Sequence, residues 1–184
     1  RVQATVEAEL GRPLDAVFAE FDPAPVAAAS VAQVHRARLR DGREVAVKVL
    51  RPGIAEEVAI DLDVMEPLFK RLALQGVPIA GPLYRFLRGF RTQVAEELDL
   101  RNEARTMLYF RAVAEASGLG FDNVYVPEPY PELSGKNVLT MEFLDGVPID
   151  DHDWAAESGI DAGPLVEEVV QAWRKAGAEP GWSE

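Results

Sequence analysis

The sequence predicts an α+β domain: a small antiparallel sheet with helices inserted before its last strand. Three observations lead to this class. Residues 25–50 contain three strand-like runs, and Asp41-Gly42 separates two of them with a pair that favours a two-residue type I′ hairpin turn. Residues 54–75 and 83–115 carry apolar residues at three- and four-residue spacing, which is typical of helices. Residues 137–143 then indicate a further strand.

Composition narrows the possible functions. At 184 residues the chain can build one ordinary core, and 48% hydrophobic with 27% charged residues is typical of a soluble globular protein. A net charge of −12 argues against a nucleic-acid partner, because such binding depends on phosphate neutralisation by Lys and Arg. The absence of cysteine excludes disulfides, thiol catalysis and zinc–thiolate sites. There is no apolar run of membrane-spanning length and no signal peptide, so a cytoplasmic location is expected.

The N-terminal region predicts helix before strand. A short amphipathic helix is expected over residues 2–10, because apolar residues recur at every fourth position and Gly11 follows as a C-cap. Residues 14–21 are expected to form a second helical turn that leads into the sheet. The three strands of this region are expected at residues 25–30, 33–40 and 43–50.

The middle of the chain predicts two helices. The first covers residues 54–75, and Pro67 should kink it or split it in two because proline removes a helical hydrogen bond. After a loop rich in Gly and Pro, a second, longer helix is expected over residues 83–115. The remaining elements are a short strand at 123–126, the last strand at 137–143, and a helix that begins between 161 and 164.

A nucleotide-binding hairpin is indicated by residues 27–48. Alanines 27, 29 and 32 occupy the three glycine positions of the pattern G-x-G-x-x-G-x-V, which Val34 completes. Residues 45–48 read VAVK, the strand motif whose lysine, here Lys48, contacts the α- and β-phosphates of a nucleotide. Because alanine pays on the order of 1 kcal/mol for positive φ, this loop should be stiffer and more helix-prone than a glycine loop.

These residues, with two later segments, resemble the UbiB or aarF family of atypical protein kinases. Residues 27–53, 97–104 and 138–146 match the family's loop and lysine strand, its E-x-D segment and its interlobe hinge, in that order. The resemblance implies a protein-kinase-like N-lobe over residues 1–145, and hinge exit plus the first C-lobe helix over 146–184. It also implies ATP or ADP as ligand, Mg²⁺ as cofactor, and a role in coenzyme Q (ubiquinone) and related isoprenoid-quinone metabolism. Lipids, quinone-biosynthesis proteins and a peripheral membrane surface are then the expected partners.

The chain also departs from the family. The family's K-x-G-Q motif lies upstream of residue 1, while its catalytic loop and Asp-Phe-Gly-like motif lie downstream of residue 184. His35 and His152 are the two histidines, and neither stands in an Asp-Asn constellation. We therefore expect a fragment that is inactive by itself although the longer protein is an enzyme, with no metal ligands in this chain.

The candidate catalytic residues are Lys48 and Glu103. A lysine at the end of a buried strand needs a charged partner, and the second helix offers Glu96, Glu97, Asp99 and Glu103. On one continuous helix Asp99 and Glu103 would share a face, whereas Glu97 and Asp99 would point about 200° apart. The resemblance assigns Glu103 to the ion pair with Lys48, and Glu97 and Asp99 to the regulatory E-x-D positions.

Further residues are expected to contact the nucleotide. Met141 would border the adenine, and backbone groups of Glu142 and Leu144 would read its edge. His35 is expected to be structural, and the role of Gln33 stays open. The complete predicted nucleotide set is Ala27, Ala28, Ala29, Ser30, Val34, Ala46, Lys48, Met141, Glu142 and Leu144.

Two alternatives to an ATP-dependent kinase or ATPase remain. One is a pseudokinase that binds nucleotide as a scaffold without phosphoryl transfer. The other is a small-molecule phosphotransferase of the antibiotic-kinase type, which the alanine loop and the E-x-D segment disfavour.

Overall fold

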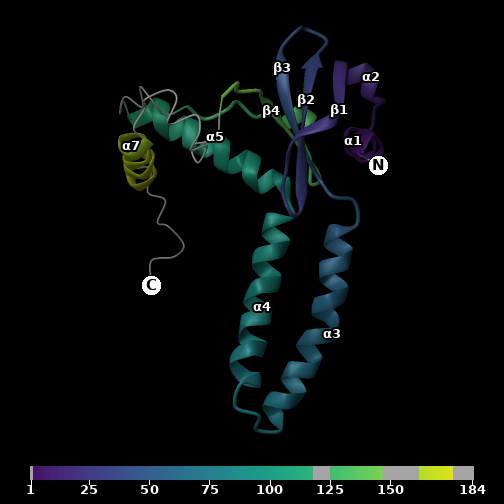
Figure 1. The fold of residues 1–184 in the computed structure, drawn as a ribbon, viewed down its shortest axis with the longest axis vertical. Coiled ribbons are helices and arrows are strands. Elements are labelled where there is room, and N and C mark those ends of the chain that lie inside the picture. Colours follow the sequence, from purple (N-terminus) through teal and green to yellow (C-terminus); the bar gives the residue numbers. More distant parts are fainter. Residues whose placement is uncertain (1, 118–124, 147–161, 176–184) are drawn as a thin grey trace.

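A four-stranded antiparallel sheet of order β1-β2-β3-β4 forms the centre of the computed structural model, which describes residues 2–117, 125–146 and 162–175. The strands are β1 (Phe18–Ala28), β2 (Ala32–Leu39), β3 (Glu44–Leu50) and β4 (Val138–Glu142). The helices are α1 (Val2–Leu10), α2 (Leu14–Val17), α3 (Ile54–Leu74), α4 (Ala80–Glu97), α5 (Leu100–Ser117), the 3₁₀ turn η1 (Pro131–Leu133) and α7 (Ala162–Lys175). Figure 1 shows α3 and α4 as an antiparallel pair that projects from the sheet. None of the helices in the described ranges is long and apolar enough to cross a membrane.

Each face of the sheet covers a different core. On one face, side chains of β2 and β3 such as Ala37, Val45 and Val47 pack against Val6 of α1 and Val17 of α2. On the other face, Ala32, Leu50 and Leu139 pack against the junction of α4 and α5, where the apolar residues are Leu98, Leu100 and Ala104. Because strand side chains alternate between faces, this second face also carries Val34, Ala46 and Lys48.

The β2–β3 hairpin has a different turn from the one predicted. Gly42 has a φ of 92°, but no residue other than glycine in the described ranges has a positive φ, so Asp41 does not fit type I′. The N–H of Gly42 donates to the Leu39 carbonyl at 3.0 Å, and the N–H of Leu39 donates to the Arg43 carbonyl at 2.8 Å. This is a type I turn followed by a glycine bulge, a three-residue loop that needs a left-handed residue only at its last position.

The first strand begins earlier than predicted. The helical turn expected over 14–21 ends at Val17, and β1 begins at Phe18. Phe18 is buried and pairs with Leu39, which favours the extended conformation over a longer helix. Pairing between β1 and β2 is irregular from Phe18 to Ala27, and Pro23 and Pro25 in this stretch have no N–H to donate.

Three α-helices, and not two, lie between β3 and β4 in the described residues. Pro67 does not divide α3, which is helical from Ile54 to Leu74. The second predicted helix is wrong as a single element, because it is broken into α4 and α5 at Leu98 and Asp99. Asp99 Oδ1 accepts from the N–H of Arg101 at 3.1 Å, which is an N-cap, and the N–H of Leu100 donates to the Lys136 carbonyl at 2.9 Å.

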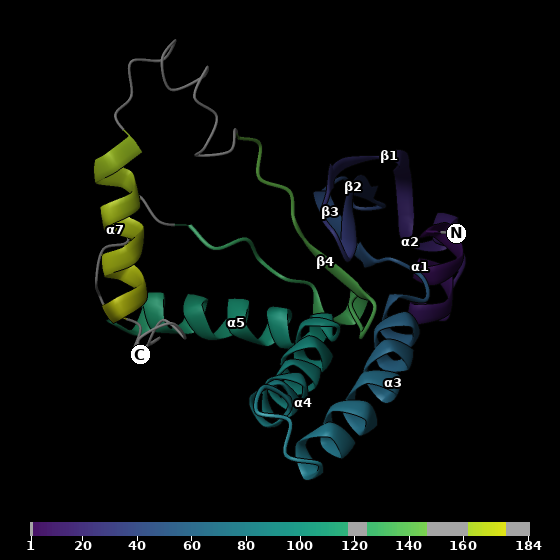
Figure 2. The ribbon, with the colours of Figure 1, turned by 60° about the horizontal axis from the view of Figure 1, so that its bottom comes forward.

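The predicted strand at 123–126 is not present in its described part. Residues 125–128 have no strand, and the nearest pairing is an isolated bridge between Pro129 and Met141. The last strand is present as β4, and α7 begins at Ala162. In Figures 1 and 2, α7 lies beside the C-terminal end of α5. His152 lies outside the described residues.

Candidate functional site

The contact between Lys48 of β3 and Glu103 of α5 is the central feature of the site. Lys48 Nζ lies 2.9 Å from Glu103 Oε1 and 2.7 Å from Oε2, so the ammonium donates to both carboxylate oxygens. The side chains are 27% and 39% exposed, which leaves the pair open to a ligand. The helix break at Asp99 starts α5 beside the sheet and thereby brings Glu103, in its first turn, to Lys48.

Small and apolar side chains lie on the same sheet face as Lys48. In the strand register Ala27 is opposite Val34, Val34 is opposite Lys48, and Ala46 is opposite Met141. Since paired residues share a face, these four side chains line one surface that ends at the lysine. A flat apolar ring can lie against such a surface. His35 is on the opposite face, buried, with Nδ1 2.9 Å from the Asp22 carbonyl oxygen.

The alanine loop is extended and not helical. Ala27 and Ala28 end β1, and the N–H of Ala29 donates to the Ala32 carbonyl at 2.8 Å to close the turn. The N–H of Arg51 donates to the Val31 carbonyl at 2.8 Å, which anchors the loop to the end of β3. The expected helix-prone loop is therefore wrong, and alanine fits because no loop residue has a positive φ. Ser30, like its alanine neighbours 27–29, is exposed.

Some backbone groups at the end of β4, and just after it, are already hydrogen-bonded within the chain. The N–H of Glu142 donates to the Glu128 carbonyl at 2.8 Å, and its carboxylate accepts from the Tyr125 hydroxyl at 2.6 Å. That hydrogen bond raises the pKa of Tyr125. The N–H of Phe143 donates to the Glu44 carbonyl at 3.3 Å. Backbone groups of Glu142 and Leu144 were predicted from the sequence to read the adenine edge. The hydrogen bond to Glu128 uses the N–H of Glu142 and leaves its carbonyl as the group that can still accept.

Arg36 and Arg38 extend the same face, and sequence reasoning missed them. Arg36 pairs with Ala46, lies 2.5 Å from the Glu44 carboxylate, and has its guanidinium 4.6 Å from the ring centre of Phe143. Arg38 lies 3.5 Å from the same carboxylate. The pKa of Glu44 is lowered, first by its hydrogen bond with Arg36. The signal that could have found them is their alternation with Val34 along the strand.

The two E-x-D residues lie in different settings. Glu97 is the exposed last residue of α4, whereas Asp99 caps α5 and binds the Arg101 guanidinium at 2.6 and 2.8 Å. The hydrogen bond to Arg101 is the main cause of a lowered Asp99 pKa. The predicted opposition of Glu97 and Asp99 on one helix is wrong, because Asp99 lies outside both helices. Both residues line a cleft of about 420 Å³ together with Glu96 and Glu103.

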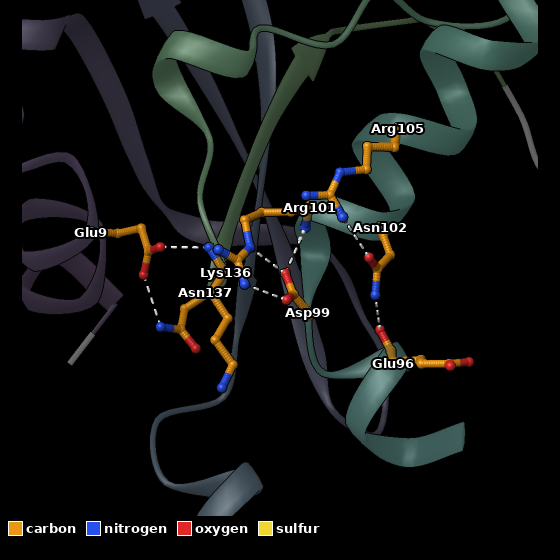
Figure 3. A network of polar contacts seen from close by, with 8 residues as sticks. All are labelled: Glu9, Glu96, Asp99, Arg101, Asn102, Arg105, Lys136 and Asn137. Carbon is orange, nitrogen blue, oxygen red and sulfur yellow. Dashed lines mark hydrogen bonds and ion pairs between the residues drawn. The ribbon is translucent and has the colours of Figure 1, made fainter. Parts of the chain in front are cut away.

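A polar network holds the helix junction against the N-terminal helix (Figure 3). In it the Glu9 carboxylate accepts from the N–H of Lys136 at 2.5 Å and from the Asn137 side-chain amide at 2.8 Å. On the helix side the Asn102 amide donates to the Glu96 carbonyl at 3.1 Å. Lys136 and Asn137 also accept from Leu100 and Leu50 through their carbonyls, so one short segment ties together α1, α5 and β3.

A metal cage is not formed by the residues that the structure describes. Among them no group of three or more His, Cys, Asp or Glu side chains is arranged to hold an ion.

Comparisons with protein-family models and with curated proteins indicate the same family. The model of the ABC1 atypical kinase-like domain matches residues 1–182. A protein from Xylella fastidiosa named "Probable protein kinase UbiB" is 36% identical over 170 residues, which cover 91% of this chain and 30% of that protein. An uncharacterised chloroplastic aarF domain-containing protein kinase from Arabidopsis thaliana is 36% identical over 163 residues, covering 83% of this chain and 28% of that protein.

A solved structure agrees with these matches. A Mycobacterium tuberculosis protein in complex with erythromycin has a TM-score of 0.71 and 31% identity, covering 96% of this chain and 44% of that one. The chain belongs to the ABC1 atypical kinase-like domain family, and its fold is kinase-like. It spans about a third of the length of the curated relatives it matches.

Proposed function

We propose that this chain is the nucleotide-binding lobe of an ATP-dependent atypical kinase or ATPase. The observation that carries the proposal is the Lys48–Glu103 ion pair at the end of an apolar sheet face. Kinases use this pair of a strand lysine and a helix glutamate to place an ammonium on the α- and β-phosphates. Family membership supports the same function.

Each part of the face has a proposed task. Val34, Ala46 and Met141 contact the adenine, while the carbonyl of Glu142 and the N–H of Leu144 read its edge. Lys48 binds the phosphates, and Glu103 keeps its side chain pointed at them. Residues 27–30 cover the phosphates, with their backbone and with the hydroxyl of Ser30.

The proposal also includes a metal ion and a metabolic role. Mg²⁺, when bound with ATP, would neutralise phosphate charge, and the resemblance places its ligands in residues other than those described here. The resemblance to the UbiB family supports a setting in isoprenoid-quinone metabolism. Quinone-biosynthesis proteins are the proposed protein partners there, and a role at the cytoplasmic face of a membrane is proposed with them.

One alternative is supported by the alanine loop. Without glycine, the backbone over the phosphates lacks easy access to positive φ, so the site can hold a nucleotide without aligning it for transfer. A nucleotide-binding pseudokinase is therefore the second candidate. It predicts the same binding, and differs only in the absence of hydrolysis by the longer protein.

Thermal-shift titration tests the proposal. ADP present at about 100 times its Kd should add about 2.7 kcal/mol to the stability of the wild type. Lys48→Ala should lose this stabilisation, and Lys70→Ala, which removes an exposed lysine from α3, should keep it. Lys48→Arg retains the charge opposite Glu103 and controls for loss of fold. Equal nucleotide stabilisation of wild type and Lys48→Ala would remove Lys48 from the site.

A further inference from the structure

Among the described residues, the end of the α3–α4 hairpin is the part farthest from the sheet. Figures 1 and 2 show the two helices leaving the sheet side by side, with the connecting turn at their distant end. We call residues 68–88, which include this turn, the hairpin tip. The tip contains no residue of the candidate nucleotide face, so its surface needs a separate explanation.

The charge of the hairpin is opposite to that of the chain. Residues 67–95 contain five basic residues and no Asp or Glu. The net charge is −12 overall and +5 within this segment, so the remaining residues carry −17. The basic residues are Lys70, Arg71, Arg85, Arg88 and Arg91.

Most of these basic side chains form no ion pair with a carboxylate among the described residues. Arg91, which lies on α4 outside the tip, binds Asp63 at 2.8 Å and Glu66 at 2.6 Å. The other four side chains are exposed and make no ion pair with any residue that the structure describes. The tip therefore presents cations that have no acidic partner within the described fold.

Exposed apolar side chains lie among these cations. Leu74 and Ile79, which flank the turn, are 82% and 68% exposed, and Val77 between them is 37% exposed. Leu68 and Phe86, about two turns back along each helix, are 51% and 62% exposed. Large side chains rarely remain so exposed together at one end of a molecule unless something covers them.

We propose that the hairpin tip docks on an anionic lipid surface. An apolar turn surrounded by Arg and Lys fits the headgroup region, because the alkyl side chains enter the acyl boundary while the cations meet lipid phosphates. The acidic remainder of the chain is repelled by the same surface, so the molecule would stand on its tip with the sheet held away. This proposal deepens the membrane role named above but does not depend on nucleotide binding.

Vesicle co-sedimentation of the purified protein tests this docking. The wild type should bind mixed vesicles made of equal amounts of phosphatidylcholine and phosphatidylglycerol. It should not bind vesicles of pure phosphatidylcholine. Raising the salt concentration should release it. Arg85→Gln with Arg88→Gln should weaken binding roughly 25-fold, since each basic residue near the surface contributes about fivefold. Leu74→Ser with Ile79→Ser should also weaken it.

A matched control is available on the same helix. Ile60 and Val64 are 62% and 67% exposed but lie in the acidic first half of α3, so Ile60→Ser with Val64→Ser should leave lipid binding unchanged. Absence of wild-type binding, or an equal loss in this control, would overturn the proposal. Sedimentation velocity would show whether a second copy of the chain covers the tip. The proposal would also be overturned if the wild type self-associated, the tip variants did not, and none of them bound lipid. Nucleotide stabilisation should be the same in all these variants.

Discussion

The Lys48–Glu103 ion pair should contribute more to ligand binding than to the stability of the fold. Both side chains are partly exposed, so solvent screens the attraction and limits its contribution to stability. An exposed pair of this kind contributes at most about 1 kcal/mol to the free energy of unfolding. Its main effect should be on where the ammonium points, and hence on ligand binding.

A double-mutant cycle on these two residues should show strong coupling. Glu103→Gln should reduce ADP affinity, yet change the free energy of unfolding by no more than about 1 kcal/mol. With Lys48→Ala already present, Glu103→Gln should have little further effect on affinity, because the glutamate acts through the lysine. Calorimetric titration of the four proteins measures this, and additive losses would separate Glu103 from the function of Lys48.

Asp99 should support stability both as a cap and as a charge. Asp99→Ala should lower the free energy of unfolding by about 1 kcal/mol, while Asp99→Asn should cost less because asparagine also caps helices. The folded pKa of Asp99 is lowered, so ionisation stabilises the fold above about pH 4 and this contribution is lost as pH falls through the folded pKa. Urea unfolding across pH should therefore show the difference between wild type and Asp99→Asn shrinking in acid. A constant difference would contradict this.

At the scale of elements, the docking of α1 depends on a close approach at Gly135. A Cβ at this position would overlap Glu9 Oε1 and lie 2.6 Å from Glu9 Cδ. Gly135→Ala should therefore push the carboxylate from its hydrogen bonds to Lys136 and Asn137. We expect a loss of about 1–2 kcal/mol in the free energy of unfolding.

The cost of Gly135→Ala should depend on Glu9. In a Glu9→Ala background the added methyl group has no carboxylate to displace, so the same substitution should cost much less. Urea denaturation of the four proteins measures the coupling. Equal costs in both backgrounds would show that Gly135 is needed for its own backbone and not for the contact with α1.

The β1–β2 loop gives a prediction that separates conformation from stability. Ala29 has an ordinary negative φ, so Ala29→Gly relieves no strain and should cost about 0.5–1 kcal/mol in stability. Glycine also makes left-handed conformations accessible, which should let the loop approach the phosphates more closely. We predict that the ratio of ATP to ADP affinity shifts toward ATP in calorimetric titrations. An unchanged ratio together with a lower melting temperature would leave only the stability effect.

At the scale of the whole molecule, the chain should bind nucleotide without hydrolysing it. Phosphoryl transfer requires metal ligands and a group that orients the nucleophile. The described residues hold no cluster of metal ligands, and no His-Asp-Asn catalytic loop occurs in the sequence. A coupled phosphate-release assay should give the same background for wild type and Lys48→Ala. Hydrolysis that disappears in Lys48→Ala would contradict the prediction.

Local patterns in the sequence were sufficient for the parts of the fold that short-range physics controls. The alternation of residues in β2 and β3, the VAVK run that ends at Lys48, and the helical spacing of α3 can all be read within a few residues. The α+β class followed from these patterns, and the kinase-like fold that the family resemblance implied was confirmed. The pairing of Lys48 with Glu103 was assigned by resemblance, since spacing alone left four acidic candidates.

Tertiary structure decided the features that depend on contacts between distant residues. The break between α4 and α5 requires the Lys136 carbonyl to accept from Leu100, and the early start of β1 requires Phe18 to pair with Leu39. Neither Lys136 nor Leu39 could be identified as a partner from the spacing of apolar residues within a helix. The sequence by itself therefore determined which residue types lie on the sheet face around Lys48. The distance of Glu103 from Lys48 was decided by packing, because a backbone group ends a helix where a distant segment offers it a hydrogen bond.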